Sequence, residues 1–229
     1  MIEAAPAQAR AGVVRAALVW ARGLPGCSKT SAAPPYLAEL LDRVRAEGEA
    51  FLTPERKAAV RGMLRFGKYR PAGRAKPSSE YLLAAALEGN FPLVNGPVDA
   101  NNAVSLEWGY PASVFDAAKA GHELLLRRGT ADEAYVFNPS GQTIELEDLL
   151  VACRRVRAGA LEAWEPCGNP VKDAMATKVF EDATDIVAVV YAPVSEGRES
   201  LEACAARFAL LLKGECGAQE SGFSISEET

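Results

Sequence analysis

Side chains that could hold or hydrolyse a ligand are concentrated in residues 91–116 of this 229-residue chain. Amides, carboxylates and hydroxyls alternate there with valine, leucine and phenylalanine. Polar groups that are cut off from water need hydrogen-bond partners, so this mixture favours a polar network or a ligand pocket. The alternative is a helix flanked by Asn and Asp caps and turns. The polar residues concerned are Asn95, Asp99, Asn101, Asn102, Ser105 and Asp116.

A second polar segment, residues 167–178, precedes a continuous apolar run at 185–192. Its sequence is Cys-Gly-Asn-Pro-Val-Lys-Asp-Ala-Met-Ala-Thr-Lys, which glycine and proline divide into a loop. Loops beside strand ends commonly carry binding groups. The segment therefore predicts either part of a binding site or an ordinary turn followed by a short helix.

Nucleophilic catalysis has little support in the sequence. A serine or cysteine nucleophile needs an adjacent base, and the one histidine, His122, lies in a turn-like Ala-Gly-His-Glu sequence. Paired carboxylates for acid–base chemistry are available between Asp173 and Asp185, but 24% of the residues are charged and such pairs are common by chance. We expect most of these carboxylates to be surface charges.

The charge balance limits how the chain could contact RNA. A formal net charge of -5 has the wrong sign for a protein whose whole surface binds nucleic acid, so any contact must be local. Residues 56–76 are rich in Lys and Arg interleaved with aromatic residues, a pattern that could grip phosphates and stack on a base. A solvated basic helix face is the alternative. The predicted RNA-binding residues are Arg65, Lys68, Tyr69, Arg70, Arg74 and Lys76.

Composition predicts a reduced, cytoplasmic protein without a metal or another cofactor. The five cysteines form no C-x-x-C pair, and a single histidine leaves no cluster with the spacing of zinc ligands. The chain has no run of eighteen apolar residues that would predict a membrane span. Its N-terminus also lacks the basic-then-apolar order of a secretory signal. With 49% hydrophobic residues, we expect one domain at 12–213, an N-terminal arm at 1–11 and a flexible tail at 214–229.

Periodicity and turn signals predict an α+β fold of mixed or antiparallel sheets with packed helices, because strands and helices do not alternate regularly. Asp99 is the expected cap of a helix that turns Asn102 inward. Residues 151–157 fit either a strand or a helix. That helix is predicted at 99–108, and the other predicted helices are 34–45, 53–66, 78–87 and 199–213. The predicted strands are 12–24, 123–127, 135–137, 143–146 and 185–192.

The spacing of the polar segment resembles a known module. Val98-Asp99-Ala100-Asn101-Asn102 and the Leu-Glu-Trp-Gly-Tyr-Pro-Ala-Ser-Val-Phe-Asp of residues 106–116 align without a gap with the B3/B4 module of the bacterial phenylalanyl-tRNA synthetase beta subunit. That module reads Val-Val-Asp-x-Thr-Asn and then Leu-Glu-x-Gly-x-Pro-x-His-Ala-Phe-Asp. Lys-Pro-Ser-Ser-Glu-Tyr-Leu at 76–82 is similar to a segment of free-standing B3/B4 proteins.

The resemblance implies an aminoacyl-ester pocket, because the module hydrolyses tyrosine wrongly attached to phenylalanine tRNA. Asn102 falls on the family asparagine and would position the ester or a water molecule. The family histidine falls on Ser113, and the family Gly-Gly-Glu loop is replaced by residues 171–178, which are similar to free-standing relatives. The implied catalytic residues are Asn102, Asp173 and Thr177, and the implied substrate-binding residues are Asn95, Asp99, Ser113 and Phe115.

The function that follows from this resemblance is a trans-acting aminoacyl-tRNA deacylase. Hydrolysis of an activated ester needs little more than a bound water molecule and donors for the developing oxyanion. Two alternatives stay open. One is a non-catalytic module that binds aminoacyl-tRNA or an amino acid, which the missing histidine and Gly-Gly-Glu loop favour. The other is a transferase that passes the aminoacyl group to a metabolite.

Overall fold

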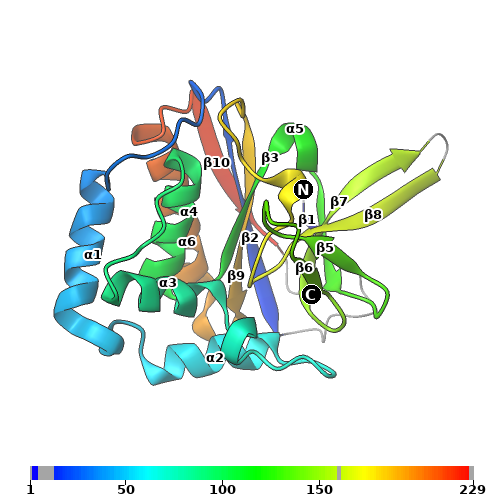
Figure 1. Ribbon diagram of the computed structural model, residues 1–229, viewed down its shortest axis with the longest axis horizontal. Coiled ribbons are helices and arrows are strands. Elements are labelled where there is room, and N and C mark those ends of the chain that lie inside the picture. The colour runs from blue at the N-terminus through cyan, green and yellow to red at the C-terminus, as the bar shows by residue number, and fades with distance from the viewer. Residues whose placement is uncertain (1, 5–12, 159–160, 227–229) are drawn as a thin grey trace.

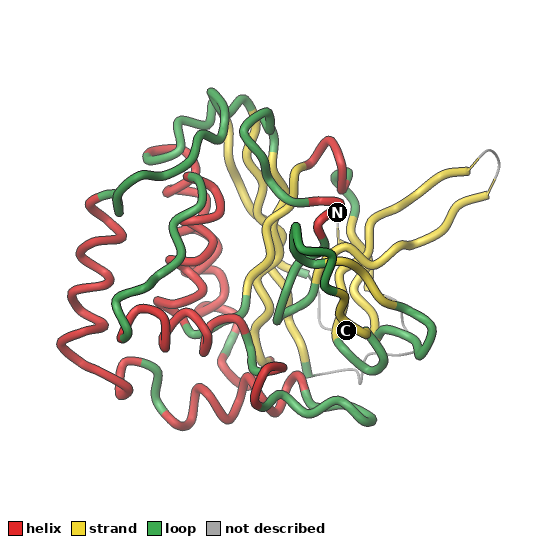
Figure 2. The backbone as a smooth tube through the Cα atoms, in the orientation of Figure 1, coloured by secondary structure: helices red, strands yellow, loops and turns green. Residues whose placement is uncertain are grey.

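A computed structural model describes residues 2–4, 13–158 and 161–226. Within them, strands occupy the middle and one side of the molecule and most helices gather on the other side (Figure 2). The strands form two four-stranded sheets and one two-stranded hairpin. The α+β class with largely antiparallel sheets is confirmed.

The central sheet is antiparallel throughout and has the strand order β10-β2-β9-β3. Its inner strand β9 is buried at every residue, because helices cover one face and the second sheet lies against the other (Figure 1). A strand buried on both faces explains the unbroken apolar run that predicted it. The strands are β2 (Val14–Arg22), β3 (Ala112–Asp116), β9 (Ile186–Pro193) and β10 (Glu220–Ile225).

The second sheet has the order β1-β4-β7-β8, with β1 parallel to β4 and the other pairs antiparallel. The β7–β8 hairpin projects away from the body, and the small β5–β6 hairpin lies beside the sheet (Figure 1). These strands are β1 (Ile2–Ala4), β4 (Leu124–Arg128), β5 (Ala134–Val136), β6 (Thr143–Glu145), β7 (Leu150–Ala158) and β8 (Leu161–Gly168).

Helix α4 is the inner member of the helical layer and packs against α1, α3, α6 and strand β3. Most of its residues are buried, including the polar Asp99, Asn101 and Ser105. The helices are α1 (Pro35–Glu47), α2 (Pro54–Leu64), α3 (Ser78–Leu87), α4 (Gly96–Trp108), α5 (Ala117–Ala120) and α6 (Arg198–Gly214), with short 3-10 turns at Gly48–Phe51, Gly73–Ala75, Met175–Thr177 and Val194–Glu196.

The structure corrects two expectations from the sequence and decides one point that the sequence left open. Asn95, not Asp99, caps α4, so the helix begins three residues earlier than predicted. Residues 151–157, which fitted either a strand or a helix, belong to strand β7. This strand pairs with β8, and β8 was not predicted. The predicted flexible tail contains β10, because Glu220–Ile225 pair with Ala17–Arg22 along the free edge of β2. No helix in the described part of the chain is long and apolar enough to cross a membrane.

Candidate functional site

A cavity of about 490 Å³ lies where α3, the N-terminal half of α4 and strand β3 meet the loop after β8. The exposed surface of its wall is mostly apolar, although half of the residues that line it are polar or charged. That composition is typical of small-molecule sites. The apolar lining comes from Leu82, Leu93, Val98, Ala112, Val114, Val171 and Val179, and the polar or charged lining from Cys27, Lys29, Ser78, Asn95, Asn101, Asn102, Asn169, Lys172, Asp173, Lys178 and Glu181.

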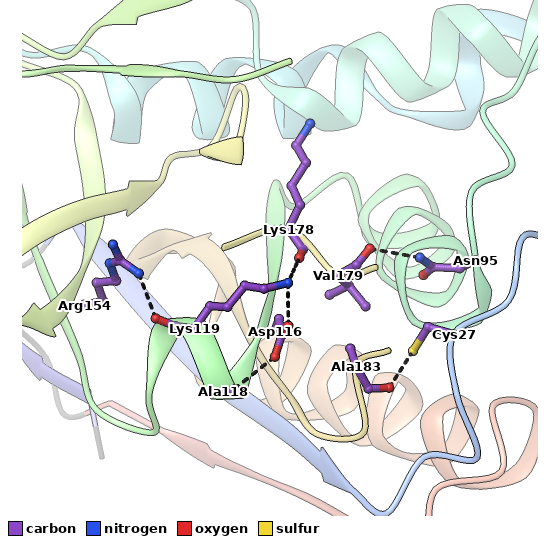
Figure 3. Close-up of polar contacts among 9 residues, drawn as sticks. All are labelled: Cys27, Asn95, Asp116, Ala118, Lys119, Arg154, Lys178, Val179 and Ala183. Atoms are coloured by element: carbon purple, nitrogen blue, oxygen red, sulfur yellow. Dashed lines mark hydrogen bonds and ion pairs between the residues drawn. The ribbon is translucent and has the colours of Figure 1, made fainter. Parts of the chain in front are cut away.

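Asn95 joins the cavity wall to α4. Its Oδ1 accepts a hydrogen bond from the Val98 N–H at 3.2 Å, which caps the helix, and its Nδ2 donates to the Val179 carbonyl at 3.1 Å (Figure 3). The side chain is 4% exposed. Both ends of the amide are therefore committed to the protein, and Asn95 fixes the wall on which a ligand would rest.

Asp99 lies beneath the wall and does not line the cavity. Its Oδ1 accepts from the Val94 N–H at 2.8 Å, and the side chain is fully buried. Burial raises the pKa of this carboxyl. Asp99, predicted to bind substrate, therefore holds the loop before α4 in this structure.

Asn101 and Asn102 both line the cavity from α4. Asn102, predicted as a catalytic residue, is half-buried. Asn101 was not predicted as a site residue, yet it is 4% exposed and its Nδ2 donates to the Ala112 carbonyl at 3.3 Å. Helical spacing could have found it, since Val98, Asn101 and Asn102 are three and four residues apart on one face.

Asp173 is the acidic group that enters the cavity from the loop after β8. Burial raises the pKa of Asp173 to about 7, although hydrogen bonding from Ser113, the charge of Lys178 and the Val114 N–H favour the charged form. A carboxyl that titrates near neutral pH in an apolar site is suited to proton transfer.

Ser113, Phe115 and Thr177 are fully buried and lie behind the wall. The Ser113 hydroxyl receives a hydrogen bond from the Tyr191 hydroxyl at 3.3 Å, and its own proton can be donated either to the Asn169 carbonyl, 3.4 Å away, or to the Asp173 carboxyl. Thr177 donates to the Cys167 carbonyl at 3.2 Å. In this structure these residues support the wall and the Asp173 loop and do not line the cavity, whereas the sequence predicted Thr177 as catalytic and Ser113 and Phe115 as substrate-binding.

The loop that carries Asp173 is held by Asn169 and by Tyr135 of β5, which the sequence analysis missed. Oδ1 of Asn169 accepts from the N–H groups of Val171 and Lys172 at 2.8 and 2.9 Å. Nδ2 of Asn169 donates to the Tyr135 hydroxyl at 2.6 Å, and that hydroxyl donates to the Lys172 carbonyl at 2.7 Å. The β5–β6 hairpin thus clamps the loop beside the cavity.

Exposed aromatic rings and ammonium groups surround the mouth of the cavity. Tyr81 and Phe180 are 58% and 47% exposed, and both line it. The ammonium of Lys119 lies 4.8 Å from the Phe180 ring centroid, held there by the Asp116 carboxylate and the Lys178 carbonyl (Figure 3). Lys29 and Lys172 are exposed lining residues.

Several of the predicted RNA-binding residues in segment 65–76 contact other groups of the protein. Tyr69 is 8% exposed and its hydroxyl donates to the Ala75 carbonyl at 2.7 Å, so its ring offers little surface on which a base could stack. Lys68 pairs with Glu147 at 2.7 Å. The Arg70 guanidinium turns back onto the Gly67 carbonyl at 2.7 Å. Among the remaining predicted residues, Arg65 and Arg74 are exposed and Lys76 is half-buried.

Cys27 is the thiol of the cavity wall. Its Sγ donates to the Ala183 carbonyl at 3.3 Å (Figure 3), and burial raises its pKa to about 11. The thiol is therefore protonated at neutral pH and unsuited to nucleophilic attack. Within the described residues, no group of three or more His, Cys, Asp or Glu side chains could hold a metal ion.

Comparison with known proteins gave a family and several similar solved structures, one of which is described here. A family model described as B3/4 domain matches residues 69–199, more than half of the chain. No curated protein matches. A solved structure, an N-terminal fragment of the phenylalanyl-tRNA synthetase beta-subunit from Pyrococcus horikoshii, is similar with 10% sequence identity and a TM-score of 0.43. The likeness covers 58% of this chain and 45% of that chain.

Proposed function

Because the chain belongs to the B3/4 domain family, we propose that its cavity receives the aminoacyl end of a charged tRNA and hydrolyses the ester bond. The resemblance of residues 98–116 to the editing module supports an aminoacyl-ester substrate. The volume of about 490 Å³ supports a ligand of that size. A protein with this activity would act on mischarged tRNA in trans and would be found in the cytoplasm.

The observation that carries the proposal is the Asp173 carboxyl, whose pKa burial raises to about 7. Such a group is partly ionised at neutral pH and is a stronger base than an ordinary carboxylate, so it can remove a proton from water. The apolar lining strengthens electrostatic interactions with charge that develops during the reaction.

The proposed reaction has two steps. The Asp173 carboxylate takes a proton from water while the water oxygen bonds to the ester carbonyl carbon, giving a tetrahedral oxyanion. The C–O bond to the ribose then breaks, and the ribose oxygen takes the proton from Asp173. Asn102, which lines the same cavity, can donate its amide N–H to the oxyanion or to the water molecule.

We propose that the main RNA contact is at the cavity mouth, and that residues 65–76 contribute less to it. Tyr81 and Phe180 expose rings on which a terminal base can stack, and Lys29 and Lys172 can approach its phosphate. In the 65–76 segment the ring of Tyr69 is buried, and Lys68 and Arg70 are engaged with protein groups. Arg65 and Arg74 could still add a distant phosphate contact.

The test is deacylation of a panel of mischarged tRNAs by the wild type, Asp173→Asn and Asp42→Asn. Asp42 is an exposed carboxylate on α1 outside the cavity and is the matched control. We expect the wild type and the control to release free amino acid and Asp173→Asn to lose at least a hundredfold in rate. Equal rates for all three proteins would overturn the role of Asp173, and no release from any charged tRNA would overturn the hydrolase.

The same assay separates the two rival functions. A binding module is favoured by the protonated Cys27 thiol and by Ser113, which lies behind the wall where the family has histidine. It would retain charged tRNA on a filter without releasing amino acid. A transferase would give a new conjugate in the presence of a metabolite extract, which mass spectrometry would detect.

A further inference from the structure

Asn101 carries an acceptor that the protein does not use. Its Nδ2 donates to the Ala112 carbonyl at 3.3 Å, and a carbonyl can only accept, so the orientation of the amide is determined. Within the described residues, no donor reaches Oδ1 of Asn101, although the atom is buried. An unpaired buried acceptor destabilises the folded chain, and a ligand that supplies a donor removes this cost.

Asp173 places a negative charge on the same wall. The Asp173 carboxyl approaches the Val114 N–H, whereas the Asn101 amide donates to the Ala112 carbonyl. Residues 112 and 114 point to the same face of β3, and both line the cavity, about 7 Å apart along the strand. Oδ1 of Asp173 is buried next to Gly168, and the rest of the carboxyl group is available as an acceptor. Two acceptors, one of them acidic, therefore flank one patch of wall.

The lysines of the site do not fill this position. The ammonium of Lys178 donates to the Phe137 carbonyl at 2.7 Å, and that of Lys172 lies 3.9 Å from the Phe137 ring centroid. Phe137 belongs to the loop of the β5–β6 hairpin and does not line the cavity. Both ammonium groups thus rest at the hairpin, and no lysine of the cavity, Lys29 included, lies within hydrogen-bond distance of Oδ1 of Asn101.

From this arrangement we infer that Asn101 recognises a free primary ammonium group, the α-amino group of the aminoacyl ligand. An ammonium offers three N–H donors and a positive charge, which suits a neutral acceptor beside a carboxylate. In an aminoacyl ester this group is attached to the carbon next to the reacting carbonyl. Asn101 is then a specificity-determining residue that excludes N-blocked aminoacyl groups. The inference rests on the proposed function for the identity of the ligand.

The inference is tested by binding, with compounds that cannot be hydrolysed as esters. Alaninamide, leucinamide and phenylalaninamide are titrated into the full chain by NMR, alongside their N-acetyl forms and the amides that lack the amino group. We expect the free amines to bind at least tenfold more tightly than both analogues. Equal affinity for the analogues without an amino group, or no binding of any amine, would overturn the inference.

Two variants locate the effect. Asn101→Leu keeps the approximate volume and removes the acceptor, so the preference for the free amine should fall to about one. Ser105→Ala is the matched control, because Ser105 Oγ is also buried without a partner on α4 but does not line the cavity. It should keep the wild-type preference, and a preference that survives in Asn101→Leu contradicts the assignment. If Asn101→Leu does not fold, the wild-type comparison still decides.

Failure here is distinguishable from failure of the proposed function. A protein that prefers free amines but releases no amino acid from charged tRNA keeps the ammonium site and loses the hydrolase. A protein that hydrolyses N-acetylaminoacyl-tRNA as fast as aminoacyl-tRNA keeps the hydrolase and loses the ammonium site.

Discussion

Gly168 and Asp173 pack so closely that a Cβ atom on the glycine would lie 2.6 Å from Oδ1 of Asp173. The same Cβ would collide with the ring of Phe115. The glycine therefore leaves the space that the carboxyl needs beside β3, and its lack of a side chain is a requirement of the site.

Gly168→Ala should lower the free energy of unfolding by about 1–3 kcal/mol, because the new methyl group overpacks the wall. It should also displace Asp173 and slow hydrolysis. Gly62→Ala is the control, since no atom lies within 4 Å of a Cβ there and alanine in α2 should stabilise the chain by about 0.5–1 kcal/mol. Urea unfolding measures both changes, and a neutral Gly168→Ala would contradict the packing.

The raised pKa of Asp173 predicts opposite effects of pH on rate and stability. The proposed base works when ionised, so hydrolysis should increase as pH rises through about 7. Stability should change in the other direction. A folded pKa above the unfolded value means that the folded state binds the proton more tightly, so stability is lost as pH rises from about 4 to 7.

Asp173→Asn should therefore be inactive and, above pH 7, more stable than the wild type, because the amide has no charge to desolvate. Thermal unfolding from pH 4 to pH 8 tests this. The difference in melting temperature between the variant and the wild type should grow toward pH 7 and then level off. A difference that does not vary with pH would show that Asp173 has an ordinary pKa.

Tyr135→Phe should loosen the loop that carries Asp173. The variant removes the donor to the Lys172 carbonyl and the acceptor for Asn169 Nδ2. We expect a loss of about 1–3 kcal/mol and faster amide hydrogen exchange at 171–173. Tyr81→Phe is the control for stability, because Tyr81 is 58% exposed, and it should change the free energy by less than about 0.5 kcal/mol. Unchanged exchange in Tyr135→Phe would mean that the hairpin does not clamp the loop.

Salt dependence should distinguish the two candidate RNA surfaces. Lys29→Ala combined with Lys172→Ala should weaken binding of charged tRNA and reduce the slope of log affinity against log salt by about 0.7 for each phosphate that the protein no longer neutralises. Arg65→Ala combined with Arg74→Ala should have the smaller effect. Filter binding at several salt concentrations measures both. The opposite ranking would return the RNA contact to residues 65–76.

Removal of residues 218–229 should destabilise the domain, because β10 covers the edge of β2. A Cβ on Gly222 would lie 2.7 Å from Cζ2 of Trp20, so the two strands pack closely as well as pairing. The truncated chain should unfold at a lower urea concentration and expose an unpaired strand edge that promotes aggregation. If removal has no effect on the unfolding midpoint, β10 contributes nothing to stability in solution.

Elements with a strong local pattern were predictable. The helical spacing of apolar residues indicated α1 and α6, cap and stop residues indicated α3, and the apolar run of β9 indicated a buried strand. Strand β10 was missed because its sequence, Glu-Ser-Gly-Phe-Ser-Ile, is typical of a loop, and its partner is about two hundred residues away. The start of α4 was misplaced because both Asn95 and Asp99 are good caps, and only the fold selects between them.

The sequence by itself determined the α+β class, the family resemblance of residues 98–116 and the presence of Asn95, Asn102 and Asp173 at one site. Tertiary structure decided which polar residues face the cavity. Ser113, Phe115 and Thr177 match the family spacing but lie behind the wall, whereas Asn101 lines it. Spacing fixes the order of residues along an element, but burial and the pKa of Asp173 depend on distant segments that pack around it.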